Sequence, residues 1–406
     1  NKDYTGIRNF TISGELDAGS LDISGDIDVD GTTNLDAVDV DGAVNFAADV
    51  TFADGADIIT ASAGTSNFRA GVNTGNSITS GGNYNVLVGD EAGTALTTGD
   101  NNVAVGYAAG DALTTSNNNV AIGSSALSAD TLGTKTVAVG VDALKTQNFT
   151  TNTDTYNVAM GYHAGRDVTT GVNNTLLGAL AGDALTTGSN NHAIGRDALG
   201  ADTLGSQSIA IGRLALGSQN FTTATDVYNV AIGSQAGYAI STGIYNTLVG
   251  ALSGDALTDA DNNVALGWGT LSTDTLGSRS VAIGRSALQN QNFTTATDSY
   301  NTAVGYSAGV SVTTGVQNTI LGGLAGDALT TGSQNVALGY QSLSTDDLGS
   351  HNVAIGANAL SDMNFATATD SYNTAVGDQA GLRVTTGVQN TFIGGLSGDA
   401  TTTGVR

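Results

Sequence analysis

The chain has no cysteine and no proline, and it is poor in charged and aromatic side chains. Without cysteine, neither disulfides, thiolate metal sites nor a catalytic thiol can form. Without proline, no hydrogen bond is lost from the ladder of a central β-strand. Because no run of 18 or more apolar residues occurs, the sequence also predicts no membrane insertion.

The charge that is present is mostly negative. Among 406 residues, 37 are acidic and 12 basic, a formal charge of −25, which disfavours nucleic acid as a partner because it is itself a polyanion. Apolar residues make up 40%, too many for a disordered acidic tail. Since the chain begins at Asn1 without a visible signal peptide, we expect a processed or excised piece of a longer protein.

A pentad, Asn-Val-Ala-Ile-Gly with variations, recurs 18 times, with its glycine running from Gly89 to Gly394. The first glycines stand at positions 89, 106, 123, 140 and 161, and the same four spacings then recur. We call each unit with one pentad a rung and each set of four rungs a cycle. Three spacings of 17 residues and one of 21 leave room for two short strands with their turns, but not for a helix with a strand. The repeats therefore predict an all-β fold over residues 83–406, a β-solenoid of about 18 rungs stacked at ~4.8 Å per rung.

The positions within the pentad predict how the strand is buried. The second and fourth residues are mostly Val, Ile or Thr and share one face, which we assign to the core of the solenoid. The third residue is always apolar and usually Ala, although it lies on the opposite face, so that face should be covered by sister chains. This predicts a homo-oligomer whose seam contains Ala104, Ala121, Ala138, Ala159, Leu176, Ala193, Ala210, Ala231 and Leu248.

Three pentads carry a family resemblance: Asn119–Gly123, Ser208–Gly212 and Ser280–Gly284. They resemble the head repeats of trimeric autotransporter adhesins, which also occur in bacteriophage tail-fibre proteins. The resemblance covers roughly residues 83–406. It implies a left-handed parallel β-roll in an intertwined homotrimer, with the pentad strand towards the threefold axis. The rungs here are longer than is common in adhesin heads, and the phage and bacterial origins both stay open.

Residues 1–60 are predicted to form a different, acidic and strand-rich module, joined by a connector at 61–82. Alternating apolar and acidic residues, as in Leu21-Asp22-Ile23, predict half-buried strands, and we expect a β-prism-like module shared among chains. Asp26, Asp28 and Asp30 begin like a calcium loop, but Ala37 stands where the bidentate Glu should be. Solvated strand carboxylates are therefore the preferred interpretation, and a calcium site is the alternative.

The long rung of each cycle carries an insertion, with an aromatic residue at both ends and one Asp inside. Rings beside carboxylates and hydroxyls suit stacking on carbohydrate, and loops repeated along a rod would bind multivalently. The alternative is that the rings only pack against neighbouring rungs. The possible ligand residues are Phe149, Asp154, Tyr156, Phe221, Asp226, Tyr228, Phe293, Asp298, Tyr300, Phe365, Asp370 and Tyr372.

Other motifs give weaker hypotheses. Thr-Thr-Gly, as at Thr97-Thr98-Gly99, could order water or ice in a regular array, but it is missing from about half of the rungs, so turn chemistry is preferred. His192 takes a position held elsewhere by Val or Thr and is expected to be a buried core imidazole. No catalytic or phosphate-binding grouping appears, so we expect neither an enzyme nor a cofactor.

Together these features predict a non-catalytic, extracellular fibre or adhesin shaft from a phage tail or a cell surface, with itself as principal partner. A receptor-binding head that contacts host glycans or protein through the lateral loops is the alternative, and an ice- or surface-binding solenoid is a third. The exposure of Phe149 and its equivalents separates the first two, because a shaft should bury these rings and a binding head should present them.

Overall fold

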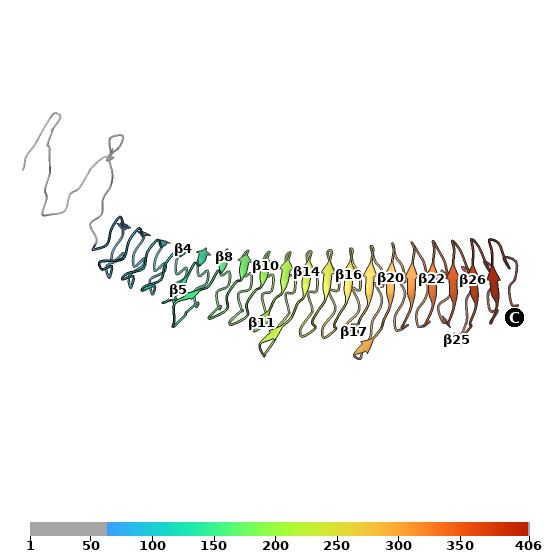
Figure 1. The fold of residues 1–406 in the computed structure, drawn as a ribbon. Coiled ribbons are helices and arrows are strands. Elements are labelled where there is room, and N and C mark those ends of the chain that lie inside the picture. The colour runs from blue at the N-terminus through green and yellow to red at the C-terminus, as the bar shows by residue number, and fades with distance from the viewer. Residues whose placement is uncertain (1–62, 405–406) are drawn as a thin grey trace, which may run out of the picture. The chain divides into compact units, whose positions relative to one another are not determined.

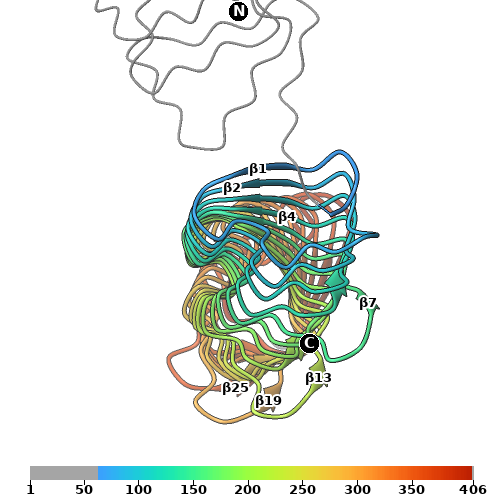
Figure 2. The same ribbon diagram turned by 90° about the vertical axis from the view of Figure 1, so that its left-hand side faces the viewer.

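The computed structural model describes residues 63–404, so the predictions for residues 1–60 and for Asp26, Asp28 and Asp30 lie outside the described residues. The chain divides into two units, Asn1–Ile58 and Ile59–Arg406, and all described residues belong to the second. This unit is all-β, with strands and turns but no helix in residues 63–404. Figure 1 shows a stack of similar rungs, and Figure 2 shows the same stack from its end.

One strand per rung forms a 19-stranded parallel sheet along the whole stack, the main sheet. Its strands are β1 (Phe68–Ala70), β2 (Val86–Val88), β3 (Val103–Val105), β4 (Val120–Ile122), β6 (Val137–Val139), β8 (Val158–Met160), β9 (Thr175–Leu177), β10 (His192–Ile194), β12 (Ile209–Ile211), β14 (Val230–Ile232), β15 (Thr247–Val249), β16 (Val264–Leu266), β18 (Val281–Ile283), β20 (Thr302–Val304), β21 (Thr319–Leu321), β22 (Val336–Leu338), β24 (Val353–Ile355), β26 (Thr374–Val376) and β27 (Thr391–Ile393).

Neighbouring rungs pair in register, so equivalent residues of successive pentads lie side by side. Ala210 in β12, for example, is opposite Ala231 in β14. The predicted parallel β-solenoid is thus confirmed, with one rung more than expected. The extra rung is β1, inside the range assigned to the connector, where Arg69 stands at the usual alanine position and the spacing from Gly71 to Gly89 differs from that of the regular rungs.

The middle residue of each strand points into the solenoid of its own chain, which reverses the predicted burial. From Leu87 to Ala375 the middle residue is fully buried, whereas the first and third residues are half-buried or exposed. The predicted seam residues, Ala104, Ala121, Ala138, Ala159, Leu176, Ala193, Ala210, Ala231 and Leu248, are therefore core residues that a single chain already covers. The turn side of each rung packs close to the strand, so that alanine fills most of the middle positions and a larger side chain there requires a glycine opposite it.

Side-chain volumes across this narrow core are complementary. Leu176, Leu248 and Ile320 take equivalent places in successive cycles, and each faces a glycine of its own rung, where an added Cβ would lie 2.8–3.3 Å from the large side chain. Where the middle residue is Ala210, Leu216 takes the place of that glycine and is fully buried. In these rungs a large residue on one side of the core thus faces a small one on the other, as close packing requires.

A ladder of buried asparagines precedes the strands and connects the rungs. The side chain of Asn246 accepts a hydrogen bond from the backbone N–H of Asn263 at 3.0 Å and donates one to the carbonyl of Ala260 at 2.7 Å. The same pattern recurs along the stack, although Thr136, Ser208 and Ser280 replace asparagine once in each of three cycles. Each amide thus satisfies buried backbone groups that the main sheet leaves unpaired.

The pentad glycine forms the corner after each strand. Gly212 has a φ of 134°, which L-residues rarely adopt, and an added Cβ would lie 2.3 Å from the carbonyl oxygen of Gly233 on the next rung. Both conditions recur along the stack, so glycine is required by conformation and by the close approach of successive backbones.

Candidate functional site

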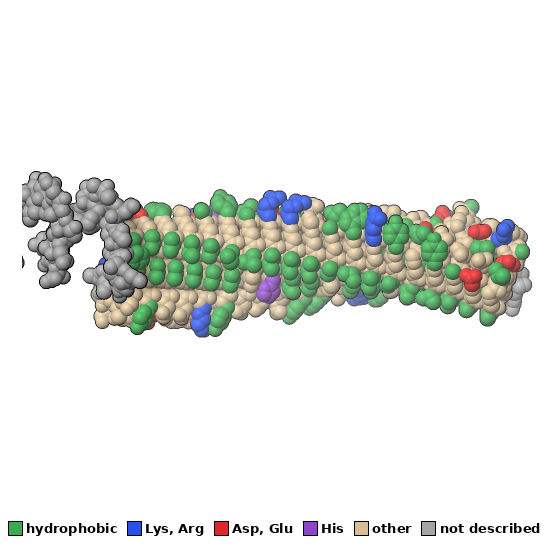
Figure 3. Space-filling view, turned by 90° about the horizontal axis from the view of Figure 1, so that it is seen from above, with side chains coloured by type: hydrophobic (Ala, Val, Ile, Leu, Met, Phe, Trp, Pro, Cys, Tyr) green, Lys and Arg blue, Asp and Glu red, His purple; other side chains and the backbone are tan. Residues whose placement is uncertain are grey.

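The outward side of the main sheet is an uncharged apolar surface. We call it the sheet face and define it by the first and third residues of the 19 strands of the main sheet. It contains no Asp, Glu, Lys or Arg, although the whole chain carries a net charge of −25. Met160 and Leu266 are 46% and 44% exposed on it. Figure 3 shows rows of apolar side chains along the stack, with Lys and Arg at their margins.

His192 is the one titratable side chain on the sheet face, in the first position of β10. It is exposed, between Thr175 and Ile209 of the neighbouring strands, so the expected buried core imidazole is wrong. The error has the same origin as the seam assignment, because the first strand position points out of the solenoid and not into it.

Aromatic and basic side chains line both margins of the sheet face. The leading edge is the residue two places before each strand, and the trailing edge is the residue two places after it. Apart from Tyr238, every tyrosine of residues 63–404 lies on one of these edges, as does the single Trp of the chain. The leading edge holds Tyr84, Lys135, Tyr156, Tyr228, Tyr245, Arg279, Tyr300, His351 and Tyr372; the trailing edge holds Tyr107, Tyr162, Arg196, Arg213, Trp268, Arg285, Tyr306 and Tyr340.

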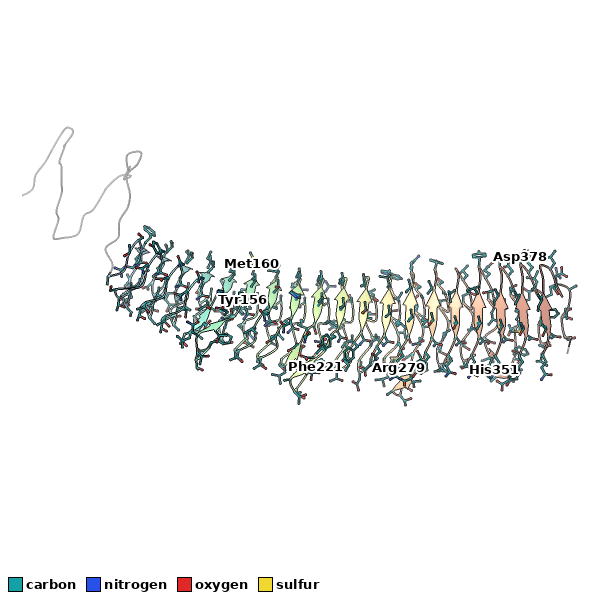
Figure 4. The ribbon with its side chains drawn as sticks, in the orientation of Figure 1. Tyr156, Met160, Phe221, Arg279, His351 and Asp378 are labelled. Atoms are coloured by element: carbon teal, nitrogen blue, oxygen red, sulfur yellow. The ribbon has the colours of Figure 1, made fainter. Side chains whose placement is uncertain are left out.

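The edge side chains stand out from the stack and pack on one another. The Arg285 guanidinium lies between Trp268 and Tyr306, at 5.2 Å and 5.8 Å from their ring centroids. On the other margin, the rings of Tyr228 and Tyr245 are stacked with their centroids 5.6 Å apart. In Figure 4 Asp378 of the trailing edge lies on the upper side of the stack, and Arg279 and His351 of the leading edge lie on the lower side.

The long rungs form four lateral ledges at residues 149–156, 221–228, 293–300 and 365–372. Each ledge is held by a two-stranded parallel pair: β5 (Gly133–Thr134) with β7 (Thr153–Asp154), β11 (Gly205–Ser206) with β13 (Thr225–Asp226), β17 (Gly277–Ser278) with β19 (Thr297–Asp298), and β23 (Gly349–Ser350) with β25 (Thr369–Asp370). Figure 2 shows the ledges projecting from the stack at successive positions around it.

The phenylalanines at the base of the ledges are buried. Phe149, Phe221, Phe293 and Phe365 are only 5–7% exposed, whereas the tyrosines at the other end of each ledge are about half exposed. The rings that were candidates for ligand stacking therefore divide into two groups. The phenylalanines are buried, and Tyr156, Tyr228, Tyr300 and Tyr372 stay open to solvent.

A buried carboxylate that sequence reasoning missed supports each ledge. Asp130 accepts hydrogen bonds from the backbone N–H groups of Gly133 and Phe149 and, at 2.6 Å, from Nε2 of Gln147. Burial raises the pKa of Asp130 above its ordinary value, and the Gln147 amide opposes that rise. Asp202 with Gln219 and Asp274 with Gln291 repeat the arrangement at the same 2.6 Å distance. The recurrence of this Asp and Gln at the same places in successive cycles was the available signal.

The fourth cycle lacks the amide. Met363 stands where the other cycles have Gln, and Oδ2 of Asp346 is buried without a hydrogen-bond partner. Oδ1 still accepts from Gly349 at 3.0 Å. Burial raises the pKa of Asp346, with a smaller contribution of the same sign from the neighbouring Asp347.

At the tip of each ledge, Asp and Tyr are constant while the residue that faces them changes. Lys135 pairs with Asp154 at 2.6 Å and lowers the pKa of that carboxyl, and Arg279 pairs with Asp298. His351 lies 3.5 Å from Asp370 and stacks on Tyr372. In the remaining ledge, Gln207 donates to the hydroxyl of Tyr228 at 3.1 Å, and Asp226 has no ion-pair partner among the described residues.

The Thr-Thr-Gly motifs connect rungs. Oγ1 of Thr97, Thr169 and Thr186 donates to the carbonyl oxygen of the equivalent residue one rung on, at 2.9–3.2 Å. The second threonine, such as Thr98 or Thr187, is exposed. Half of the hydroxyls are thus used inside the chain, which agrees with the preference for turn chemistry.

Within residues 63–404, no group of three or more His, Asp or Glu side chains is placed to hold a metal ion. Over the same residues, no helix has the length and apolarity to cross a bilayer. The chain matches no protein-family model and no curated protein.

Proposed function

We propose that the chain is a non-catalytic structural rod, the shaft of an extracellular fibre on a virion tail or a cell surface, and that copies of it assemble as a homotrimer through their sheet faces. The observation that carries the proposal is the sheet face itself, an uncharged apolar surface along the stack of a strongly acidic chain. Exposed apolar patches of this extent mark interaction surfaces.

Area and charge support a second copy as the occupant. Nineteen strands at ~4.8 Å spacing, each ~10 Å long, present about 900 Å² of sheet face per chain, which a trimer would divide between two neighbours; one partner in a standard stable interface contributes about 800 Å². Elsewhere the surplus of negative charge makes copies repel one another. The sheet face is therefore the surface on which they can approach most closely.

The burial of the ledge phenylalanines supports a shaft over a binding head. Phe149, Phe221, Phe293 and Phe365 are buried at the base of the ledges and leave only 5–7% of their surface to solvent. In-register ladders, the asparagine ladder and a proline-free chain give a stiff stack. The rod would hold whatever is attached at one end at a fixed distance from the other.

The test is the oligomeric state with and without a charge on the sheet face. By analytical ultracentrifugation we expect a trimer for the parent chain and a monomer for Ile211→Asp, with the β-sheet circular dichroism retained because Ile211 lies outside the core. Thr187→Asp, on the exposed turn side, is the matched control and should stay trimeric. A parent chain that stays monomeric across micromolar concentrations would refute the proposal.

A receptor-binding role of the ledges is the second candidate, favoured by one observation. Asp and Tyr persist at all four tips although their intrachain partner varies from Lys to Gln, Arg and His, so the ion pair does not explain them. A half-exposed ring beside a carboxylate suits a glycan. If the ledges bind glycans, Asp226→Asn with Tyr228→Ala should reduce binding on a glycan array. If they do not, deleting residues 213–284 should shorten the rod by about 19 Å and change nothing else.

A further inference from the structure

We infer that neighbouring copies meet edge to edge, with the trailing edge of one sheet face against the leading edge of the next at the same rung. This inference rests on the proposed homotrimer and names the side chains that would form its seams. The partner is a second copy of this chain in parallel orientation.

Symmetry restricts which edges can meet. In a closed ring of parallel copies, every contact is heterologous, so one margin of the interface patch touches the opposite margin of the neighbour. When the copies are related by a rotation about an axis parallel to the stack, equivalent rungs of all copies lie at the same height along that axis. The sheet face therefore turns towards the axis, and each seam joins a leading edge to a trailing edge.

The composition of the edges is that of an interface. Tyrosine, tryptophan and arginine are enriched at protein interfaces and dominate their binding energy, whereas aspartate is depleted. On this acidic chain the edges gather nearly all described tyrosines, the single Trp and five of the basic residues. Trp268 is 47% exposed, and the edge tyrosines also stay open to solvent in the single chain.

At such a seam, the trailing-edge residue of one copy would meet the leading-edge residue of the same rung in the next copy, and the charged residues find hydrogen-bonding partners there. The only acidic residues of the described trailing edge are Asp90 and Asp378, and both share a rung with a leading-edge tyrosine, Tyr84 and Tyr372, whose hydroxyl can donate to a carboxylate. Arg196 and Arg213 share rungs with the amides of Asn190 and Gln207, which can accept from a guanidinium.

One rung brings two positive charges to the same level. Arg285 of the trailing edge shares its rung with Arg279 of the leading edge. The charge of Arg279 is balanced by Asp298, however, and Arg285 is held between Trp268 and Tyr306. Along the described edges, no unbalanced pair of like charges therefore opposes the seam.

Cysteine cross-linking tests the pairing cleanly because the chain has no cysteine of its own. Asn173 and Ala179 are the leading- and trailing-edge residues of one rung, at most about 20 Å apart by chain length, and a short bis-maleimide that links them within one copy joins no chains. We expect the double variant Asn173→Cys/Ala179→Cys to give covalent three-chain species.

Two controls give the contrast. The pair Asn173→Cys/Ala251→Cys uses the same two edges four rungs apart, and its cross-linking should be about 100-fold slower, since only seam residues share a high effective concentration. Each single variant should give no linked species. Linkage of a single variant to itself would overturn the inference, because it requires like edges to meet.

The failure of the inference is distinguishable from that of the proposed function. A double variant that sediments as a trimer but does not cross-link would overturn the edge pairing and leave the trimeric rod intact. A double variant and a parent chain that are both monomeric would overturn both.

Discussion

Leu176 and Leu177 are neighbours in β9, and they separate the two sides of the main sheet. Leu176 points into the solenoid and is fully buried, whereas Leu177 lies on the sheet face. On the inner side, the chain itself buries the apolar side chains, and it supplies hydrogen-bond partners to the backbone groups and to all but a few buried polar atoms. On the outer side an apolar surface is left for something else to cover. Stability and assembly are thus encoded on alternate residues of one strand.

The largest expected effect contrasts these two leucines directly. Leu176→Ala should destabilise the rod by about 2–5 kcal/mol, because it leaves a cavity beside Gly165 and Gly182 that a closely packed core cannot fill. Leu177→Ala should change the unfolding midpoint of the dissociated chain by much less and weaken association instead. Urea unfolding at fixed protein concentration measures the first effect and sedimentation the second. Equal stability losses for the two variants would break the comparison.

The next effect lies in the asparagine ladder. Asn246→Ala should cost about 1–3 kcal/mol, since it leaves the N–H of Asn263 and the carbonyl of Ala260 buried without partners. Thr98→Ala, on the exposed turn side, is the control and should be nearly neutral. Thermal unfolding followed by circular dichroism compares them. An unchanged melting temperature for Asn246→Ala would mean that the ladder contributes nothing.

A smaller effect, a gain in folding stability, is expected in the fourth cycle, where Oδ2 of Asp346 lacks a hydrogen-bond donor. Met363→Gln should stabilise the fourth cycle by about 1 kcal/mol at neutral pH, because the amide would supply the donor that Oδ2 of Asp346 lacks. The reciprocal variant, Gln291→Met, should destabilise the third cycle. Hydrogen exchange at the backbone amides of Phe365 and Phe293, which take equivalent places beside the two carboxylates, reads each site locally. Slower exchange at Phe365 in Met363→Gln is the expected result.

The smallest effect is the pH dependence that Asp346 contributes in the fourth cycle. Burial raises the folded-state pKa of Asp346 above the ordinary 3.8, so the folded chain binds this proton more tightly than the unfolded chain. Stability from this group is thus present below the ordinary value, falls as pH rises through the raised pKa, and is absent at neutral pH. In urea unfolding at a series of pH values, Asp346→Asn should make the fall in stability from acidic to neutral pH smaller and gain stability at pH 7, while Asp130 and Asp202, whose pKa values burial also raises, keep their part of the slope. Asp362→Asn, exposed in the same cycle, should do neither.

The fold could be predicted from the sequence because the repeat is nearly strict. The pentad glycines, the strand length and the absence of proline leave few alternatives to a parallel β-solenoid. β1 escaped the pattern because Arg69 and the irregular spacing from Gly71 to Gly89 disguise it.

Which strand side faces inwards could not be read from the pentad, because both sides are apolar and periodicity alone does not give the thickness of the core. We expected the larger side chains, Val and Ile, to face the core, but they lie on the sheet face, and the smaller Ala faces the core. The ledges were located correctly, but the division between buried Phe221 and exposed Tyr228 depends on how the chain turns at each end.

Each rung of the main sheet is held by the rungs above and below it, and the ledge loops take no part in that ladder. A peptide bond cleaved between Phe221 and Thr225 would therefore interrupt the covalent chain without interrupting the stack, because β12 and β14 stay paired through Ile209 to Ile211. Nicked molecules should keep their length and rigidity, and proteolysis should reveal itself only after denaturation.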